Sequence, residues 1–277
     1  MSNVAPSPYT GEIEAWRRQR EADLRTPDGW LSLTGLYVLA EGTYTVGSDP
    51  ASDVVLPGSA PARLGEIVFH VGEALLTVTT DAAVLVDGVP LRSAQLVDNA
   101  GGRRPTLVTA GTVSFFLHKF GDQHAVRVKD STNPAIAAFE GRRWFPVRPE
   151  YRVQGRFTPF ADPQEIPIGT VVNTDSVYRS VGAIDFALEG RPLRLLASAG
   201  GGPDQLFIVF RDATAGEETY GAARFLTAVV APDGSIDLDF NKAYNPPCAF
   251  TPYATCPLPP RANILPLRIP AGELSPH

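Results

Sequence analysis

A proline-rich segment near the C-terminus, residues 239–260, constrains the fold of this 277-residue chain more than any other feature. It holds both cysteines of the protein, Cys248 and Cys256, together with two tyrosines and two asparagines. Proline has no backbone N–H and a fixed φ, so this segment forms neither an ordinary helix nor a central strand. The sequence therefore predicts an irregular loop of defined shape, and such loops carry function more often than core strands do.

The composition favours a folded β protein. Hydrophobic residues make up 44% of the chain and charged residues 19%, which is enough apolar material for a packed core and argues against disorder. The 25 glycines and 26 prolines are spread along the chain, a pattern typical of short strands joined by tight turns. The net charge of −6, without a long basic run, indicates that nucleic acid is not a partner.

The N-terminal sequence predicts no secretion signal and no membrane anchor. It lacks the apolar core of a signal peptide, and no apolar run in the chain reaches the ~18 residues that a membrane helix needs. We therefore expect a cytoplasmic protein without membrane contact. In that compartment two cysteines are more often thiols than a disulfide.

One helix is predicted, within an N-terminal segment of residues 1–27. Thr10 is its expected cap, and Ile13, Trp16 and Leu24 give it an apolar side. The arginines and glutamates that interleave along this segment indicate a solvated helix face. The helix is expected to end before the turn residues that precede Trp30.

Short strands separated by turn residues follow the helix in two blocks. Residues 28–140 are expected to form a compact β-sandwich, and residues 141–277 a second β-sheet or barrel closed by the loop of residues 239–260. The fold class is therefore all-β, or mainly β, with one N-terminal helix. His118 and His124 flank a predicted hairpin turn and are expected to be exposed.

Two segments of the first block, Val46–Pro57 and Val84–Leu91, follow the pattern of turn glycine and apolar strand of forkhead-associated domains, which this block resembles. The resemblance implies a β-sandwich. That family's phosphothreonine site needs an Arg after the turn glycine, whereas Ser48 follows Gly47 here, and Arg63 alone does not rebuild a bidentate phosphate site. We therefore expect the fold without phosphothreonine binding.

A second resemblance covers most of the chain. The blocks that carry it are Gly29–Leu36, Val126–Asp130, Arg143–Pro146, Phe210–Tyr220 and, above all, Asp239–Pro260 with Asn263 and Ala271–Glu273. From about residue 29 to residue 273 the chain is similar to the bacterial domain of unknown function 1684 family. This resemblance implies a shared fold and no settled activity.

Tyr220 and Arg224 are the first candidate ligand-binding residues. They lie four apart on a predicted strand and so share a face. A desolvated Arg needs an anionic partner, which is either internal, Asp239 or Glu217, or a carboxylate of a bound ligand. Asp212 is interpreted instead as a turn residue that bonds nearby N–H groups.

Asn241, Tyr244 and Asn245 open the proline-rich loop and complete the predicted ligand site. As single residues they are typical of turns and caps. Together with the Tyr and Arg before them they would line a cleft with few charges and several hydrogen-bonding groups, as small-molecule sites are built. The cysteine loop would form its wall.

Cys248 and Cys256 leave three interpretations open. They are two buried thiols, a disulfide that pins the loop, or a pair of metal ligands. Their separation is longer than the C-x₂₋₄-C spacing of structural zinc sites, and the chain offers four histidines to complete such a site. No metal and no cofactor is predicted.

The function predicted from the sequence is therefore the binding of a small molecule in a pocket of the C-terminal β unit, with its anionic character and catalysis both left open. One alternative is a protein-interaction module that uses the first sandwich. A weaker alternative is a thiol or metal enzyme that uses Cys248 and Cys256. The oligomeric state is left open.

Overall fold

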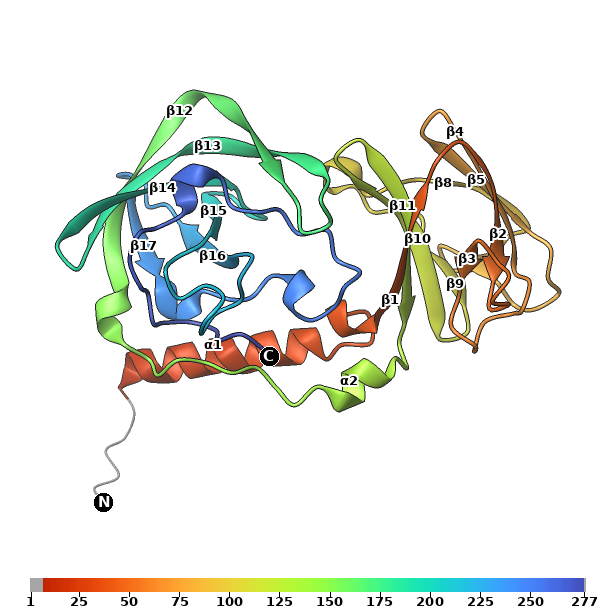
Figure 1. The fold of residues 1–277 in the computed structure, drawn as a ribbon, viewed down its shortest axis with the longest axis horizontal. Helices are drawn as coiled ribbons and strands as arrows, with labels where there is room; N and C mark the ends of the chain where they lie inside the picture. Colours follow the sequence, from red (N-terminus) through yellow and green to blue (C-terminus); the bar gives the residue numbers. More distant parts are fainter. Residues whose placement is uncertain (1–6, 277) are drawn as a thin grey trace, which may run out of the picture. The chain divides into compact units, whose positions relative to one another are not determined.

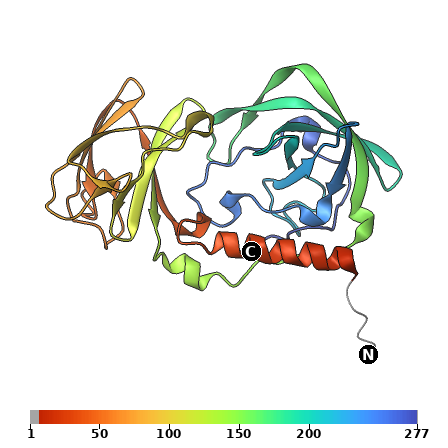
Figure 2. The ribbon, with the colours of Figure 1, turned by 180° about the vertical axis from the view of Figure 1, so that it is seen from behind.

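The computed structural model describes residues 7–276, which divide into two compact units (Figures 1 and 2). Residues 23–139 form the first, here called the sandwich unit. The residues up to 22 and from 140 onward form the second, here called the barrel unit. Most regular structure is β, with one long N-terminal helix, which confirms the predicted fold class.

The helix α1 (Pro8–Leu24) forms within the predicted N-terminal segment. Its cap is Ser7 rather than Thr10: the Ser7 Oγ accepts a hydrogen bond from the Thr10 amide at 3.2 Å. Pro8 occupies the first helical position, where its missing N–H leaves no bond unmade. Among residues 7–276, no helix is both long and apolar enough to cross a membrane.

The sandwich unit packs two sheets around one hydrophobic core. The first sheet contains, in spatial order, β1 (Leu33–Leu39), β11 (Gln123–Asp130), β10 (Val113–Phe120), β9 (Val108–Ala110), β6 (Leu85–Val86) and β7 (Val89–Pro90). The second contains β3 (Val54–Val55), β2 (Gly42–Gly47), β4 (Gly65–His70), β5 (Glu73–Val78) and β8 (Ser93–Leu96). Burial alternates residue by residue along β4 and β5, so one face of their sheet packs on the core and the other meets water. Short helices accompany them: η1 (Trp30–Ser32), η2 (Ala100–Gly102) and α2 (Pro134–Ala138).

The barrel unit contains one six-stranded antiparallel sheet. Its spatial order is β16 (Arg224–Val229), β15 (Gln205–Phe210), β14 (Arg191–Ala199), β13 (Asp175–Leu188), β12 (Arg152–Gly169) and β17 (Ser235–Asp239). A bridge between Val230 and Ile236 joins the two outermost strands, so the sheet is a nearly closed barrel (Figure 1). Its connections include η3 (Pro149–Tyr151), η4 (Phe240–Lys242), η5 (Pro247–Ala249) and η6 (Arg261–Asn263).

Side chains fill the barrel. The rings of Phe186 and Phe210 lie 5.9 and 5.5 Å from that of Phe240, which is fully buried. The C-terminal segment adds every second side chain to the same core: Leu265, Leu267, Ile269 and Ala271. Closely packed aromatic and aliphatic side chains leave the inside of a small barrel as core, so the position of a ligand site must be sought outside it.

The two histidines of the β10–β11 hairpin are buried, and the prediction that they are exposed is wrong. The loop that precedes η2 covers them: Asp98 Oδ2 lies 3.1 Å from His124 Nε2, and Asn99 Oδ1 lies 3.1 Å from His118 Nδ1. The His118 ring also stacks on Phe120. Burial, together with the charge of Arg127, lowers the pKa of His118 to about 3.

The burial of His118 predicts that the free energy of unfolding depends on pH in the acid range, and that part of this dependence comes from His118. The folded chain keeps His118 neutral down to pH about 3, whereas the unfolded chain protonates it below a pKa of about 6.5. The unfolded state therefore binds more protons between these values, so the free energy of unfolding falls as the pH falls through this window. Urea unfolding of His118→Phe at a series of pH values should show a shallower fall than the wild type. Parallel curves would contradict the assignment.

Candidate functional site

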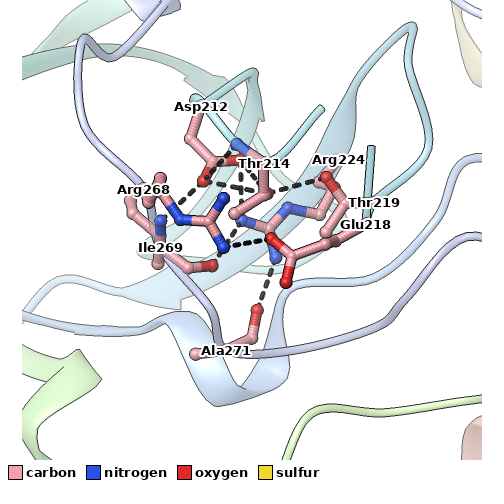
Figure 3. A network of polar contacts seen from close by, with 8 residues as sticks. All are labelled: Asp212, Thr214, Glu218, Thr219, Arg224, Arg268, Ile269 and Ala271. Carbon is pink, nitrogen blue, oxygen red and sulfur yellow. Dashed lines mark hydrogen bonds and ion pairs between the residues drawn. The ribbon is translucent and has the colours of Figure 1, made fainter. Parts of the chain in front are cut away.

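Arg224, a predicted ligand-binding residue, is buried and bound within the protein (Figure 3). It begins β16 with 1% of its surface exposed. Its Nη2 lies 2.9 Å from Asp212 Oδ1 and donates to the Ile269 carbonyl at 3.1 Å, and its Nη1 donates to the Ala271 carbonyl. Its guanidinium carbon lies 5.0 Å from the centre of the Phe210 ring. The anionic partner of Arg224 is therefore Asp212, and the two internal partners expected from the sequence, Asp239 and Glu217, are wrong.

Asp212 completes this network from the other side. Its Oδ2 accepts a hydrogen bond from the Ile269 amide at 2.7 Å, and its Oδ1 accepts one from the Thr214 hydroxyl at 2.9 Å. Thr214 Oγ1 lies 2.9 Å from Thr219 Oγ1. Burial lowers the pKa of the Arg224 guanidinium, and the Asp212 carboxylate opposes that shift. The Arg224 Nε is buried without a hydrogen-bond partner in residues 7–276, but both of its Nη atoms and both Asp212 oxygens are bound. Opposite charges buried together in this way are tolerated, whereas either one left alone is costly.

Asn241 and Asn245, also predicted to bind a ligand, hold backbone segments of the barrel unit together. The Asn241 amide donates to the Arg148 carbonyl at 2.8 Å and its Oδ1 accepts from the Arg148 amide at 2.9 Å. The Asn245 side chain donates to the Leu274 carbonyl at 2.7 Å. Each residue is almost completely buried, so both side-chain NH2 groups are bound to the chain rather than directed at solvent, whereas Asn245 Oδ1 is buried without a hydrogen-bond partner in residues 7–276.

A second buried ion pair lies beside this loop. Arg142 Nη1 donates to both carboxylate oxygens of Glu273 at 2.7 Å, and Glu273 Oε2 also accepts the Asn245 amide at 2.8 Å. Burial raises the pKa of Glu273, and Arg142 counteracts it. Gly272 makes this approach feasible because its φ is +84° and an added Cβ would lie 2.5 Å from the Ala243 carbonyl oxygen.

Tyr220 and the cysteines form a separate cluster. Tyr220 lies in the loop before β16 rather than on that strand, and its hydroxyl donates to the Cys248 carbonyl at 3.1 Å. The Cys248 amide donates to Cys256 Sγ at 3.3 Å, and the structure records two thiols rather than a disulfide. The proline-rich loop here packs on the side chains of Tyr178 and Phe225. It therefore closes one side of the barrel, as predicted.

Tyr244 is the predicted site residue that lines a cleft. The cleft has a volume of about 400 Å³. The α1 helix contributes Trp16 and Arg20, and the remaining lining residues come from the strands and from η4 with its following loop: Arg152, Gln205, Thr227, Ala228, Val229, Asp237, Asp239, Lys242 and Tyr244. Tyr220, Arg224, Asn241 and Asn245 are not among them. The structure thus separates Tyr244 from the residues that the sequence had grouped with it.

Aromatic contacts shape the cleft wall next to α1. The Trp16 ring lies 6.3 Å from that of Tyr244 in an edge-to-face arrangement and 5.6 Å from that of Trp144 on its other side. The guanidinium carbon of Arg20 lies 3.9 Å from the centre of the Tyr244 ring. Stacking of this kind fixes the plane of the guanidinium group, because the ring face attracts the cation.

Charges in the cleft are paired, with one exception. Arg152 Nε donates to Asp237 at 2.9 Å, and Lys242 Nζ lies 2.6 Å from Glu12 of α1. Asp239 accepts the Tyr9 hydroxyl at 2.8 Å. Within residues 7–276, Arg20 makes no ion pair and its Nε has no hydrogen-bond partner.

The sequence interpretation missed Trp16 and Arg20 as site residues. Arg20 was grouped with the solvated charges of the helix, and Trp16 with its apolar side. Their separation of four residues places them on one helical face, which is the signal that was available. Nothing in the sequence shows that this face meets Tyr244, 224 positions further along from Arg20.

The sandwich unit has a pocket of about 390 Å³ beside the residues where the resemblance would place a phosphothreonine site. Arg63 lines it together with Asp49 and Glu66. Two carboxylates beside a single guanidinium disfavour a phosphate group. In residues 7–276 no group of three or more His, Cys, Asp and Glu side chains is arranged to hold a metal ion.

Comparisons with known proteins place the chain in a family. The family described as "Protein of unknown function (DUF1684)" matches residues 137–274. An uncharacterised protein of Haloarcula marismortui, solved in solution, is 34% identical over 50% of this chain and 78% of its own, with a TM-score of 0.42. The forkhead-associated domain of FhaA, solved with the intracellular domain of Rv3910, is 18% identical over 33% of this chain and 96% of its own, with a TM-score of 0.24. Comparison with curated proteins gives no match.

The Arg224 network predicts a large and specific loss of stability. Arg224→Met leaves the Asp212 carboxylate buried without its partner, so the free energy of unfolding should fall by about 3–5 kcal/mol. Arg194→Met is the matched control, because its ion pair with Asp185 is exposed and should contribute about 0–1 kcal/mol. Urea unfolding measures both. Equal losses in the two variants would show that Arg224 does not have this structural role.

Proposed function

The chain belongs to the DUF1684 family of proteins of unknown function, and we propose that its barrel unit binds a small anionic molecule in the cleft beside α1. The proposal keeps the ligand class that the sequence suggested and moves the site from Arg224 to Arg20. Of the residues first predicted, Tyr244 remains in the proposed site. A cytoplasmic location stays a prediction.

The observation that carries the proposal is the state of Arg20. Its Nε is buried without a hydrogen-bond partner in residues 7–276, as are those of Arg17 and Arg224, but of these three arginines Arg20 is the one that lines this cleft, with its guanidinium carbon 3.9 Å from the centre of the Tyr244 ring. A half-buried guanidinium group is stabilised by an anion, and its planar set of N–H donors matches a carboxylate or a phosphate. A ligand anion would supply the hydrogen bonds that the protein leaves unmade.

The rest of the cleft narrows the class of ligand. Its volume of about 400 Å³ falls in the range of small-molecule sites. Arg20, Arg152 and Lys242 line it against Asp237 and Asp239, so one negative charge on the ligand balances the charges of the lining side chains. Trp16 and Tyr244 offer aromatic surface next to Arg20. The best match is a planar molecule with one anionic group.

The alternative of a protein-interaction module in the sandwich unit also stays a prediction. One observation favours it: Val68 and Leu75 pair across β4 and β5 and are both more than 40% exposed. A single apolar pair on a surface is common among monomeric proteins. It therefore supports this alternative less than the buried Arg20 Nε, which has no hydrogen-bond partner in residues 7–276, supports ligand binding.

Benzoate, with neutral benzamide as its uncharged counterpart, tests the proposed site. We expect benzoate to raise the melting temperature and to change tryptophan fluorescence with saturation, and benzamide to bind more weakly. Loss of a charged hydrogen bond costs about 1.5–3 kcal/mol, so Arg20→Gln should weaken benzoate binding by about tenfold or more and leave benzamide binding unchanged.

The control variant is Arg191→Gln, which removes an exposed arginine at the start of β14, outside the cleft. It should bind benzoate as the wild type does. Absence of benzoate binding to the wild type, or equal binding to Arg20→Gln and Arg191→Gln, would refute the proposal.

A further inference from the structure

The thiols of Cys248 and Cys256 lie close together outside the proposed ligand site. Cys248 belongs to η5 and is partly exposed, whereas Cys256 is 6% exposed and packs in the apolar cluster beneath the loop. The Cys248 amide nitrogen lies 3.3 Å from Cys256 Sγ. A partly exposed sulfur next to a buried one is the arrangement in which the first reacts with a reagent and the second follows.

The distance between the two residues is compatible with a covalent bond between their sulfurs. The amide nitrogen is about 1.5 Å from its own Cα, so Cys256 Sγ lies within about 4.8 Å of the Cys248 Cα. In disulfides the two Cβ atoms lie about 3.8 Å apart. A Cys256 sulfur within about 4.8 Å of the Cys248 Cα is compatible with that geometry once the Cys248 side chain rotates toward it. The backbone between the two residues therefore turns back far enough to bring Cys256 Sγ beside the Cys248 backbone.

The surroundings of Cys248 favour its thiolate form. The Cys256 thiol and then the Tyr220 hydroxyl lower the pKa of Cys248, against the opposing effect of burial. Burial raises the pKa of Tyr220, so the phenol keeps its proton and its hydrogen bond to the Cys248 carbonyl, which holds the Cys248 backbone in place. Thiolates are the reactive form of cysteine, and hydrogen-bond donors beside the sulfur increase their population.

We propose that Cys248 is a site of reversible oxidation by hydroperoxides and that Cys256 is its resolving thiol. The Cys248 thiolate attacks one oxygen of the peroxide bond; the S–O bond forms, the O–O bond breaks, and the leaving alkoxide or hydroxide takes up a proton. Cys256 then attacks the Cys248 sulfur of this sulfenic acid; the S–S bond forms, the S–O bond breaks, and hydroxide leaves as water with the Cys256 proton. Two thiols are oxidised and one peroxide is reduced.

Reduction by a small dithiol reverses the reaction through exchange at the same sulfurs. The proposal is independent of the cleft, since neither cysteine lines it. On this proposal the thiol pair and the disulfide, which the sequence left as alternatives, are the reduced and the oxidised state of the same two cysteines.

Hydrogen peroxide, with peptide mapping by mass spectrometry, tests the proposal on the folded full chain. The wild type should yield a cross-linked pair of peptides that has lost two hydrogen atoms and returns to thiols with dithiothreitol. Cys256→Ser should instead accumulate a sulfenic acid on Cys248, trapped by dimedone. Mapping by peptide keeps these changes apart from oxidation of Met1, the only methionine.

The order of reaction distinguishes the two cysteines. Cys248→Ser should leave Cys256 unmodified under peroxide exposure that fully oxidises the wild type, because the remaining thiol is buried. The proposal is overturned if the wild type keeps both thiols, or if Cys256 reacts as fast in Cys248→Ser as in the wild type.

Discussion

The ion pair between Arg224 and Asp212 organises the barrel unit. Asp212 follows β15, Arg224 begins β16, and both bind the backbone around Ile269 in the C-terminal segment. This segment supplies every second side chain to the barrel core, so the charged pair fixes the register in which the core is completed. A pair buried to this extent is tolerated only because both partners are hydrogen-bonded as well as paired.

The second buried ion pair, between Arg142 and Glu273, is connected to α1 by further hydrogen bonds of Arg142. The Arg142 amide donates to Glu21 Oε2 at 2.8 Å, and its Nε donates to the Arg20 carbonyl at 3.2 Å. The backbone of Arg20 is thus anchored, while its side chain lies on Tyr244 in the cleft. The hydrogen bond from Arg142 therefore holds the backbone of α1 at the position from which the Arg20 side chain reaches the cleft.

The sequence was sufficient for the architecture and insufficient for the site. Composition and turn residues predicted a mainly β chain with one helix, because these signals are local. The partner of Arg224 is twelve residues away, in a turn that looked self-contained, and those of Asn241 and Asn245 lie 93 and 29 residues away. The polar residues of the proline-rich loop suggested a shared cleft, yet the side chains of Asn241 and Asn245 are bound to two different backbone segments. Arg20 was interpreted as solvated because the sequence of a helix does not show which distant side chain will pack against a given residue, here Tyr244.

A double-mutant cycle on Asp212 and Arg224 tests most directly whether this pair organises the barrel. Urea unfolding of Asp212→Leu, Arg224→Met and the double variant gives the coupling energy. If the pair is the internal constraint described, the double variant is less destabilised than the sum of the single variants by more than about 1 kcal/mol, because no unpaired charge stays buried. Single effects that add to within about 0.5 kcal/mol would contradict the account.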